Sequence, residues 1–266
     1  MSAIAPSAYT VNAYNSARDS ENKIHDDAVA NVFGFRGGLV PGVDVYGYMA
    51  HLPVGRWGRA WLERGSASCR FLKPVYDGED ATVTASQTEN GLDIRVESGG
   101  QLCATGVASL AGAPPAPPGF GDAPPPPPVT RPPADERSLG VGTTLGMRPL
   151  SVSADFAARY LQDLRETEPL YAREGVIHPG LILRTCNWAL THNVVLGPWI
   201  HVGSTIQHFA AASVGDELSV NATVTANYER KGHRFVELDA VVVSNARTAI
   251  AHITHTAIYR PRQVTS

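Results

Sequence analysis

The stretch from Gly175 to Asn193, G-V-I-H-P-G-L-I-L-R-T-C-N-W-A-L-T-H-N, decides the fold. Pro179 suits the first turn of a helix, where its missing N–H would have no partner, so His178 is expected at the start of that helix. The residues from Leu181 to Leu190 are apolar on more than one face, which predicts a buried helix. The segment is too short, and too polar at Arg184, to span a membrane.

A related stretch occurs earlier in the chain. Gly37 to Met49 reads G-G-L-V-P-G-V-D-V-Y-G-Y-M, so Val40-Pro41-Gly42 matches His178-Pro179-Gly180 at an offset of 138 residues (from 40 to 178). The same offset relates Phe71 to Phe209. One offset held through a helix and two strands indicates an internal duplication, with the histidine kept in one copy.

Charge and composition exclude several functions. The 266 residues are 43% hydrophobic with a net charge of −3, which allows one large core or two ordinary ones and offers no basic field for nucleic acid or an anionic membrane. The N-terminus lacks a secretion signal, which favours the cytoplasm. Cys69, Cys103 and Cys186 are widely spaced and odd in number, so we expect core residues rather than disulfides or a metal site.

Around the two buried helices the chain reads as strands and turns. The first half predicts an opening strand at 9–17, a short helix at 26–33, a buried helix at 41–52 ended by Pro53, and strands at 66–72, 80–88, 92–97 and 102–110. The second half predicts an amphipathic helix at 152–165 capped by Ser153, the buried helix, and strands at 199–212, 217–228, 234–244 and 248–259.

A proline-rich segment divides the two copies. More than half of the 20 prolines lie between residues 113 and 134. Such a run favours extended geometry and cannot pair into a sheet, so 113–137 is predicted to link an N-terminal domain, 1–112, to a C-terminal domain, 138–266. A proline-motif ligand for a partner protein is the alternative interpretation.

A helix wrapped by a curled antiparallel sheet resembles the hotdog fold, and two fused copies resemble a double-hotdog protein of class α+β. The run S-E-N-K-I-H-D-D-A-V-A-N-V-F-G-F, residues 20–35, followed by G-L-V-P-G, is similar to the hydratase segment of MaoC-like acyl dehydratases. Asn22 and His25 fall on that pattern. Ser20 stands where that pattern has an acidic residue, and Asp19 and Glu21 flank it.

The resemblance implies a hydratase or dehydratase of an acyl thioester bound to coenzyme A or a carrier, with no metal or cofactor. An enolate oxygen would need free N–H groups at the start of a buried helix, here near Gly42 or Gly180. Histidine is the usual base near neutral pH, so His25 and His178 are the leading catalytic candidates and could share one composite site. Further candidates are Asn22 and Glu21 beside His25, Arg36 as an anion ligand, and Tyr171 in the degenerate second copy of the motif.

Two other functions remain open from the sequence. A thioesterase would need a carboxylate at a helix start, and Asp44 is the nearest one. A protein that binds an acyl ligand without turning it over is the third possibility, because neither half has a complete motif. The fused copies could act as a monomeric pseudo-dimer or as a homodimer of it.

Overall fold

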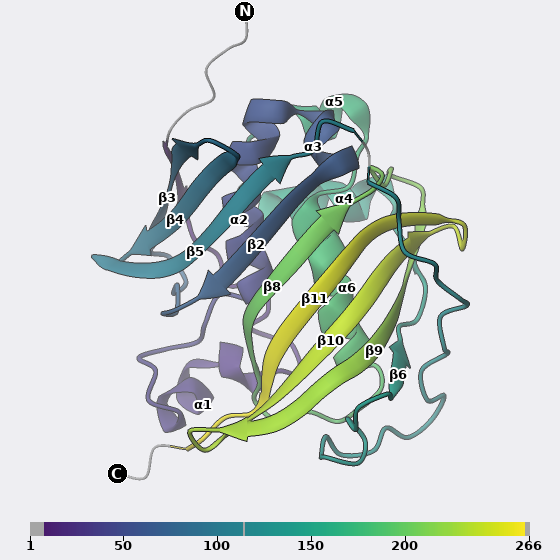
Figure 1. The fold of residues 1–266 in the computed structure, drawn as a ribbon. Helices are drawn as coiled ribbons and strands as arrows, with labels where there is room; N and C mark the ends of the chain where they lie inside the picture. Colours follow the sequence, from purple (N-terminus) through teal and green to yellow (C-terminus); the bar gives the residue numbers. More distant parts are fainter. Residues whose placement is uncertain (1–7, 114, 264–266) are drawn as a thin grey trace, which may run out of the picture.

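The computed structural model describes residues 8–113 and 115–263. One antiparallel sheet curves around two buried helices, with strand order β1-β3-β4-β5-β2-β8-β11-β10-β9-β6 and β7 paired to β9 (Figure 1). None of the helices in the described part is long and apolar enough to cross a membrane.

Each half of the chain follows the same plan, a buried helix and then a meander of strands. The elements of the first half are β1 (Ala8–Asn12), the 3-10 turn η1 (Lys23–His25), α1 (Asp27–Val32), α2 (Gly42–Trp57), α3 (Arg59–Arg64), β2 (Gly65–Phe71), β3 (Asp80–Thr88), β4 (Gly91–Ser98) and β5 (Gln101–Leu110). The second half contains β6 (Thr144–Gly146), β7 (Leu150–Ser151), α4 (Ala154–Asp163), α5 (Leu170–Glu174), α6 (Pro179–Thr191), β8 (Ile200–His208), β9 (Glu217–Arg230), β10 (His233–Ser244) and β11 (Thr248–Arg260).

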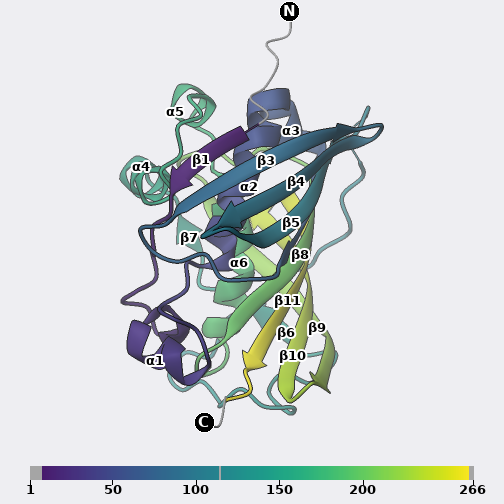
Figure 2. The ribbon, with the colours of Figure 1, turned by 90° about the vertical axis from the view of Figure 1, so that its left-hand side faces the viewer.

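The halves join where β2 pairs with β8, from Ser66↔Gln207 to Arg70↔Gly203. This ladder makes the two meanders a single sheet. β1 adds to the outer edge of the first meander by pairing with β3 (Figure 2). Because β2 and β8 pair with each other, neither is an exposed edge strand, and the single sheet has fewer unpaired backbone groups than two separate sheets would have.

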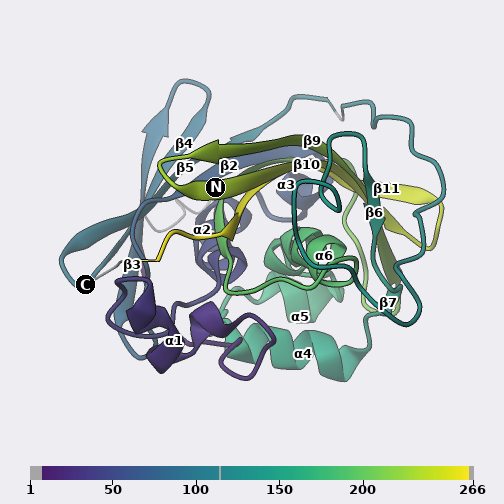
Figure 3. The same cartoon turned by 90° about the horizontal axis from the view of Figure 1, so that it is seen from below.

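The helices α2 and α6 pack against each other in the hollow of the sheet, and α4 and α5 lie on the side away from the strands (Figure 3). Every residue of α2 from Val43 to Val54 is buried. Asp44 of α2 and Arg184 of α6 form an ion pair between the two helices. The predicted α+β architecture of two sheet-wrapped helices is therefore confirmed.

Most predicted elements are present, with several differences. The opening strand predicted at 9–17 is shorter, since β1 ends at Asn12, and the short strands β6 and β7 were not predicted. The prediction that Pro53 ends the first buried helix is wrong, because α2 continues to Trp57 with Pro53 inside it. Pro53 is buried in this helix, where packing against the surrounding residues can offset the lost hydrogen bond. The short helices α3 and α5 were not expected, whereas Ser153 caps α4 as predicted by accepting from the Phe156 N–H at 3.2 Å.

The three cysteines are buried and free. The proline-rich segment contacts the second half through a bridge between Pro133 and Val195. Its role as a linker between two domains stays a prediction.

Candidate functional site

Asn22 fixes the loop that precedes the first buried helix. Its Oδ1 accepts from the N–H groups of Ile24 at 3.3 Å and Trp199 at 3.1 Å, and its Nδ2 donates to the Trp199 carbonyl at 3.0 Å. Asn22 therefore caps η1 and also joins this loop to the second half. Both of its roles are structural, and they place His25, three residues later, at a set position.

The orientation of the His25 ring follows from its neighbours. Nδ1 lies 2.6 Å from the Leu39 carbonyl oxygen, which can only accept, so Nδ1 carries the proton. Nε2 is then an unprotonated acceptor, with Asn22 Nδ2 at 3.3 Å. Burial lowers the pKa of His25 below its ordinary value, although the Leu39 carbonyl and Asp44 act in the opposite direction. His25 is thus a neutral base near pH 7.

Two adjoining cavities meet at His25. We call the first, of about 280 Å³, the inner cavity; its apolar lining includes Ile24, Phe35, Val45, Val75 and Ile200. The second, of about 520 Å³, is the outer cavity, lined by Arg131, Arg148, Arg184 and His192 among others. The two share Asn22, His25, Pro41, Asn187 and Trp199.

The start of α2 opens onto these cavities. Pro41 provides no side-chain cap, and the N–H groups of Gly42 and Val43 have no acceptor among the described residues. Gly42 lines the inner cavity and Val43 the outer one. Free N–H groups at a helix start, aided by the helix dipole, stabilise a negative oxygen.

Only glycine fits at position 42. A Cβ there would lie 2.9 Å from His201 Nδ1 and 3.1 Å from Phe71 Cε2. His201 belongs to a buried series of side-chain hydrogen bonds that the sequence did not predict. Its Nε2 is 2.9 Å from Ser204 Oγ, and Ser204 Oγ is 3.1 Å from His255 Nδ1. Alternation along β8 and β11 placed these side chains on strands, but no local signal indicated that they meet.

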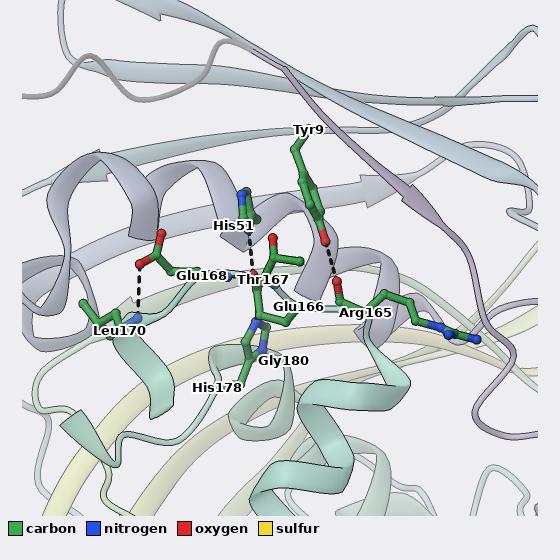
Figure 4. A network of polar contacts seen from close by, with 9 residues as sticks. All are labelled: Tyr9, His51, Arg165, Glu166, Thr167, Glu168, Leu170, His178 and Gly180. Carbon is green, nitrogen blue, oxygen red and sulfur yellow. Dashed lines mark hydrogen bonds and ion pairs between the residues drawn. The ribbon is translucent and has the colours of Figure 1, made fainter. Parts of the chain in front are cut away.

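The second buried helix begins in a different way. His178 caps its own helix, since Nδ1 accepts from the Gly180 N–H at 3.0 Å, while Nε2 lies 3.3 Å from Glu166 Oε2 (Figure 4). Glu166 Oε1 is 2.7 Å from His51 Nδ1. Burial raises the pKa of Glu166, but hydrogen bonds from His178 and His51 outweigh it and hold that pKa far below its usual range.

Aromatic side chains close this second helix start. The Tyr171 ring lies 4.6 Å from the His178 ring, and a Cβ on Gly180 would meet the Tyr160 hydroxyl at 2.6 Å. Neither the inner nor the outer cavity is lined by His178, Gly180 or Tyr171 within the described residues. The structure therefore does not bring His25 and His178 together in one cavity.

The remaining candidates from the sequence have other partners. Glu21 lies at the rim of the outer cavity, where both carboxylate oxygens accept from Arg131 at 3.0 and 3.1 Å. Arg36 pairs with Glu79 at 2.5 Å above the Tyr76 ring, and lines neither cavity in the described part of the chain. An anion-binding role for Arg36 would therefore compete with this ion pair.

Comparison with known proteins gives the fold its name. No protein-family model matches the chain, and neither does any curated protein. Among solved structures, a conserved hypothetical protein of Mycobacterium tuberculosis, described as a double hotdog, superposes with a TM-score of 0.61 over 94% of this chain and 95% of its own, at 16% identity.

The chain has a double hotdog fold. Two further solved structures superpose over most of this chain. A protein of Chloroflexus aurantiacus assigned as a MaoC domain dehydratase gives a TM-score of 0.60 at 13% identity, covering 96% of this chain and 93% of its own. A protein of Thermobifida fusca assigned as a thioesterase II gives a TM-score of 0.52 at 13% identity, covering 96% of this chain and 93% of its own. Structures that share the fold thus include both dehydratases and thioesterases.

Proposed function

We propose that this double-hotdog protein is a hydratase or dehydratase acting on an enoyl or 3-hydroxyacyl thioester. One observation carries the proposal: the neutral imidazole of His25 and the free N–H groups of Gly42 and Val43 border the same pair of adjoining cavities. A base and an oxyanion site on one cavity are the two groups that this reaction needs.

In hydration, a water oxygen bonds to the β carbon of the enoyl group while His25 Nε2 takes one of the water protons. The displaced π electrons move onto the thioester oxygen as an enolate, which the amides of Gly42 and Val43 stabilise. The imidazolium then gives its proton to the α carbon and the carbonyl re-forms. Dehydration is the reverse, so one base accounts for both directions.

This scheme requires no carboxylate. Ser20 occupies the position of the acid in the related motif, and Glu21 is already bound by Arg131. Asn22 Nδ2 lies 3.3 Å from His25 Nε2 and also holds the loop through Trp199, so its expected role is to position His25.

The thioesterase alternative lacks the group it needs. Asp44 is at the start of α2, but it accepts from Ser16 Oγ at 2.5 Å and pairs with Arg184. Its side chain lines neither cavity in the described structure. A carboxylate held in this way is not free to activate water against a carbonyl carbon.

A substrate panel tests the proposal. Enoyl-CoA and saturated acyl-CoA thioesters are offered in parallel, with loss of the conjugated absorbance and release of free thiol followed separately. We expect the conjugated enoyl absorbance to fall without release of free thiol. This activity should be abolished in His25→Gln and kept in the control His252→Gln on β11. Thiol release from saturated substrates would replace the proposal with the thioesterase, and binding without either reaction would replace it with a binding protein.

A further inference from the structure

The outer face of the sheet, which is toward the viewer in Figure 1, has a groove of about 960 Å³ across the junction of the two halves. Its floor includes Ser68 of β2 and Gly203 and Thr205 of β8, where the two strands pair. One wall comes from β4 and β5, and the other from the turn between β9 and β10. We call this feature the junction groove.

The junction groove and the inner cavity border the same side chains on opposite sides of the sheet. The β2–β8 ladder ends at Arg70↔Gly203, and beyond that pair the two strands separate. At that point Phe71, Val202 and Ile258 line both the groove and the inner cavity. The start of α2 is therefore close to the outer face of the sheet as well as to the outer cavity.

The junction groove concentrates positive charge in an otherwise acidic chain. Arg70, Arg95, Arg230 and Lys231 line it, against the single carboxylate of Asp93. Of these cations Arg70, Arg230 and Lys231 form no ion pair with any described residue. Because the whole chain has a net charge of −3, this local excess points to an anionic ligand.

The outer cavity is less suited to a polyanion, although it also contains arginines. Arg131 is paired with Glu21 and Arg184 with Asp44, so two of its three guanidinium groups are already neutralised. In the groove, Tyr228 and Phe235 add a flat aromatic pair, with ring centroids 5.1 Å apart and an interplanar angle of 3°. Free cations beside aromatic rings are the chemistry that binds phosphates and a nucleobase.

We propose that the junction groove binds the phosphorylated nucleotide end of a coenzyme A thioester, whose pantetheine arm passes between Phe71 and Val202 to the amides of α2. This inference rests on the proposed function, because it assumes that the thioester reacts beside His25. The acyl chain then occupies the inner cavity and extends toward the outer cavity.

Kinetics with two thioesters of the same acyl group test the inference. Arg70→Ala and Arg230→Ala should each raise KM for the coenzyme A thioester by about tenfold, since each removes a hydrogen bond to a charged phosphate, and should leave kcat unchanged. KM for the N-acetylcysteamine thioester, which has no phosphate, should not move. Arg159→Ala on α4, an exposed residue that lines neither the groove nor the inner or outer cavity, is the matched control and should alter neither KM. If KM for the coenzyme A thioester rose in Arg148→Ala but not in Arg70→Ala or Arg230→Ala, the nucleotide would bind in the outer cavity and the inference would be overturned.

Binding without turnover separates this inference from the proposed function. Calorimetry with adenosine 3′,5′-bisphosphate should show binding to the wild type that Arg70→Ala and Arg230→Ala weaken. If that binding is seen but no enoyl thioester is hydrated, the function fails and the groove assignment stands. If hydration is seen but the bisphosphate does not bind, the groove assignment fails, including the case in which a carrier protein delivers the substrate.

A second copy of this chain is the other occupant to exclude. Sedimentation of the wild type and of Arg70→Ala measures whether the groove is an interface between copies. A dimer that dissociates in Arg70→Ala with an unchanged KM for coenzyme A would overturn the inference.

Discussion

Three buried imidazoles make the folding stability sensitive to acid. His201, His208 and His255 are buried, and burial lowers the pKa of His208 to about 4 and that of His255 to about 3. The pKa of His201 is also well below its ordinary value, because of burial and of its neighbour His255. His208 and His255 are thus neutral in the folded chain near pH 5, and the lowered pKa of His201 acts in the same direction, while the unfolded chain binds protons on each of them from about pH 6.5 downward.

The sign and size of the effect follow from proton linkage. Since the unfolded chain binds more protons, the free energy of unfolding is highest above about pH 6.5 and falls as the pH drops toward the folded-state values. Each neutral imidazole contributes about 1.4 kcal/mol per pH unit, so His208 and His255 together contribute about 3 kcal/mol per unit near pH 5, and His201 adds to this slope in the same direction. A domain with a typical stability of about 5–15 kcal/mol would lose much of it within two or three units.

Urea unfolding followed by tryptophan fluorescence at a series of pH values measures this slope. His208→Gln should reduce this slope by about 1.4 kcal/mol per pH unit near pH 5, because one linked group is gone. Val242→Ala truncates a core side chain that does not titrate. It should lower the free energy of unfolding by the same amount at every pH and leave the pH slope as in the wild type. An identical slope in His208→Gln and the wild type would refute the reasoning.

Three further predictions concern the two helix starts. His25→Gln should lower kcat by a factor of roughly 10² to 10⁴ with little change in ligand binding. In the wild type, activity should fall on the acid side at a pH below the ordinary histidine pKa, since burial lowers the pKa of His25. An acid limb above that pKa would contradict the assignment of His25 as the base. Gly42→Ala should reduce hydration strongly because its Cβ would meet His201 Nδ1 at 2.9 Å, and full activity would show that the substrate does not use this amide. Glu166→Gln should lower the free energy of unfolding by about 3–5 kcal/mol, measured by denaturation. The protein that remains folded should stay active, measured by the loss of enoyl absorbance. A variant that is stable but inactive would place the reaction near His178 instead.

Local sequence signals were sufficient for most elements of the fold. Alternating strands, Ser153 as a cap and the repeated V-P-G and H-P-G turns depend on residues only a few positions apart. The offset of 138 residues correctly indicated two copies of one plan, and with it the α+β class. Where a local rule failed, as at Pro53, the energy came from the burial of α2 against distant strands.

The sequence by itself determined two glycine-containing helix starts and a set of histidines near them, but it did not determine which start has free N–H groups. Only the tertiary structure decided between them. Tyr160 and Tyr171 close the start of α6 against His178 and Glu166, whereas Trp199 and Leu39 hold the loop and ring of His25 beside the open amides of α2. The physical reason is that an N–H group is free or covered according to which side chains arrive from other segments, and no pattern of neighbouring residues records that.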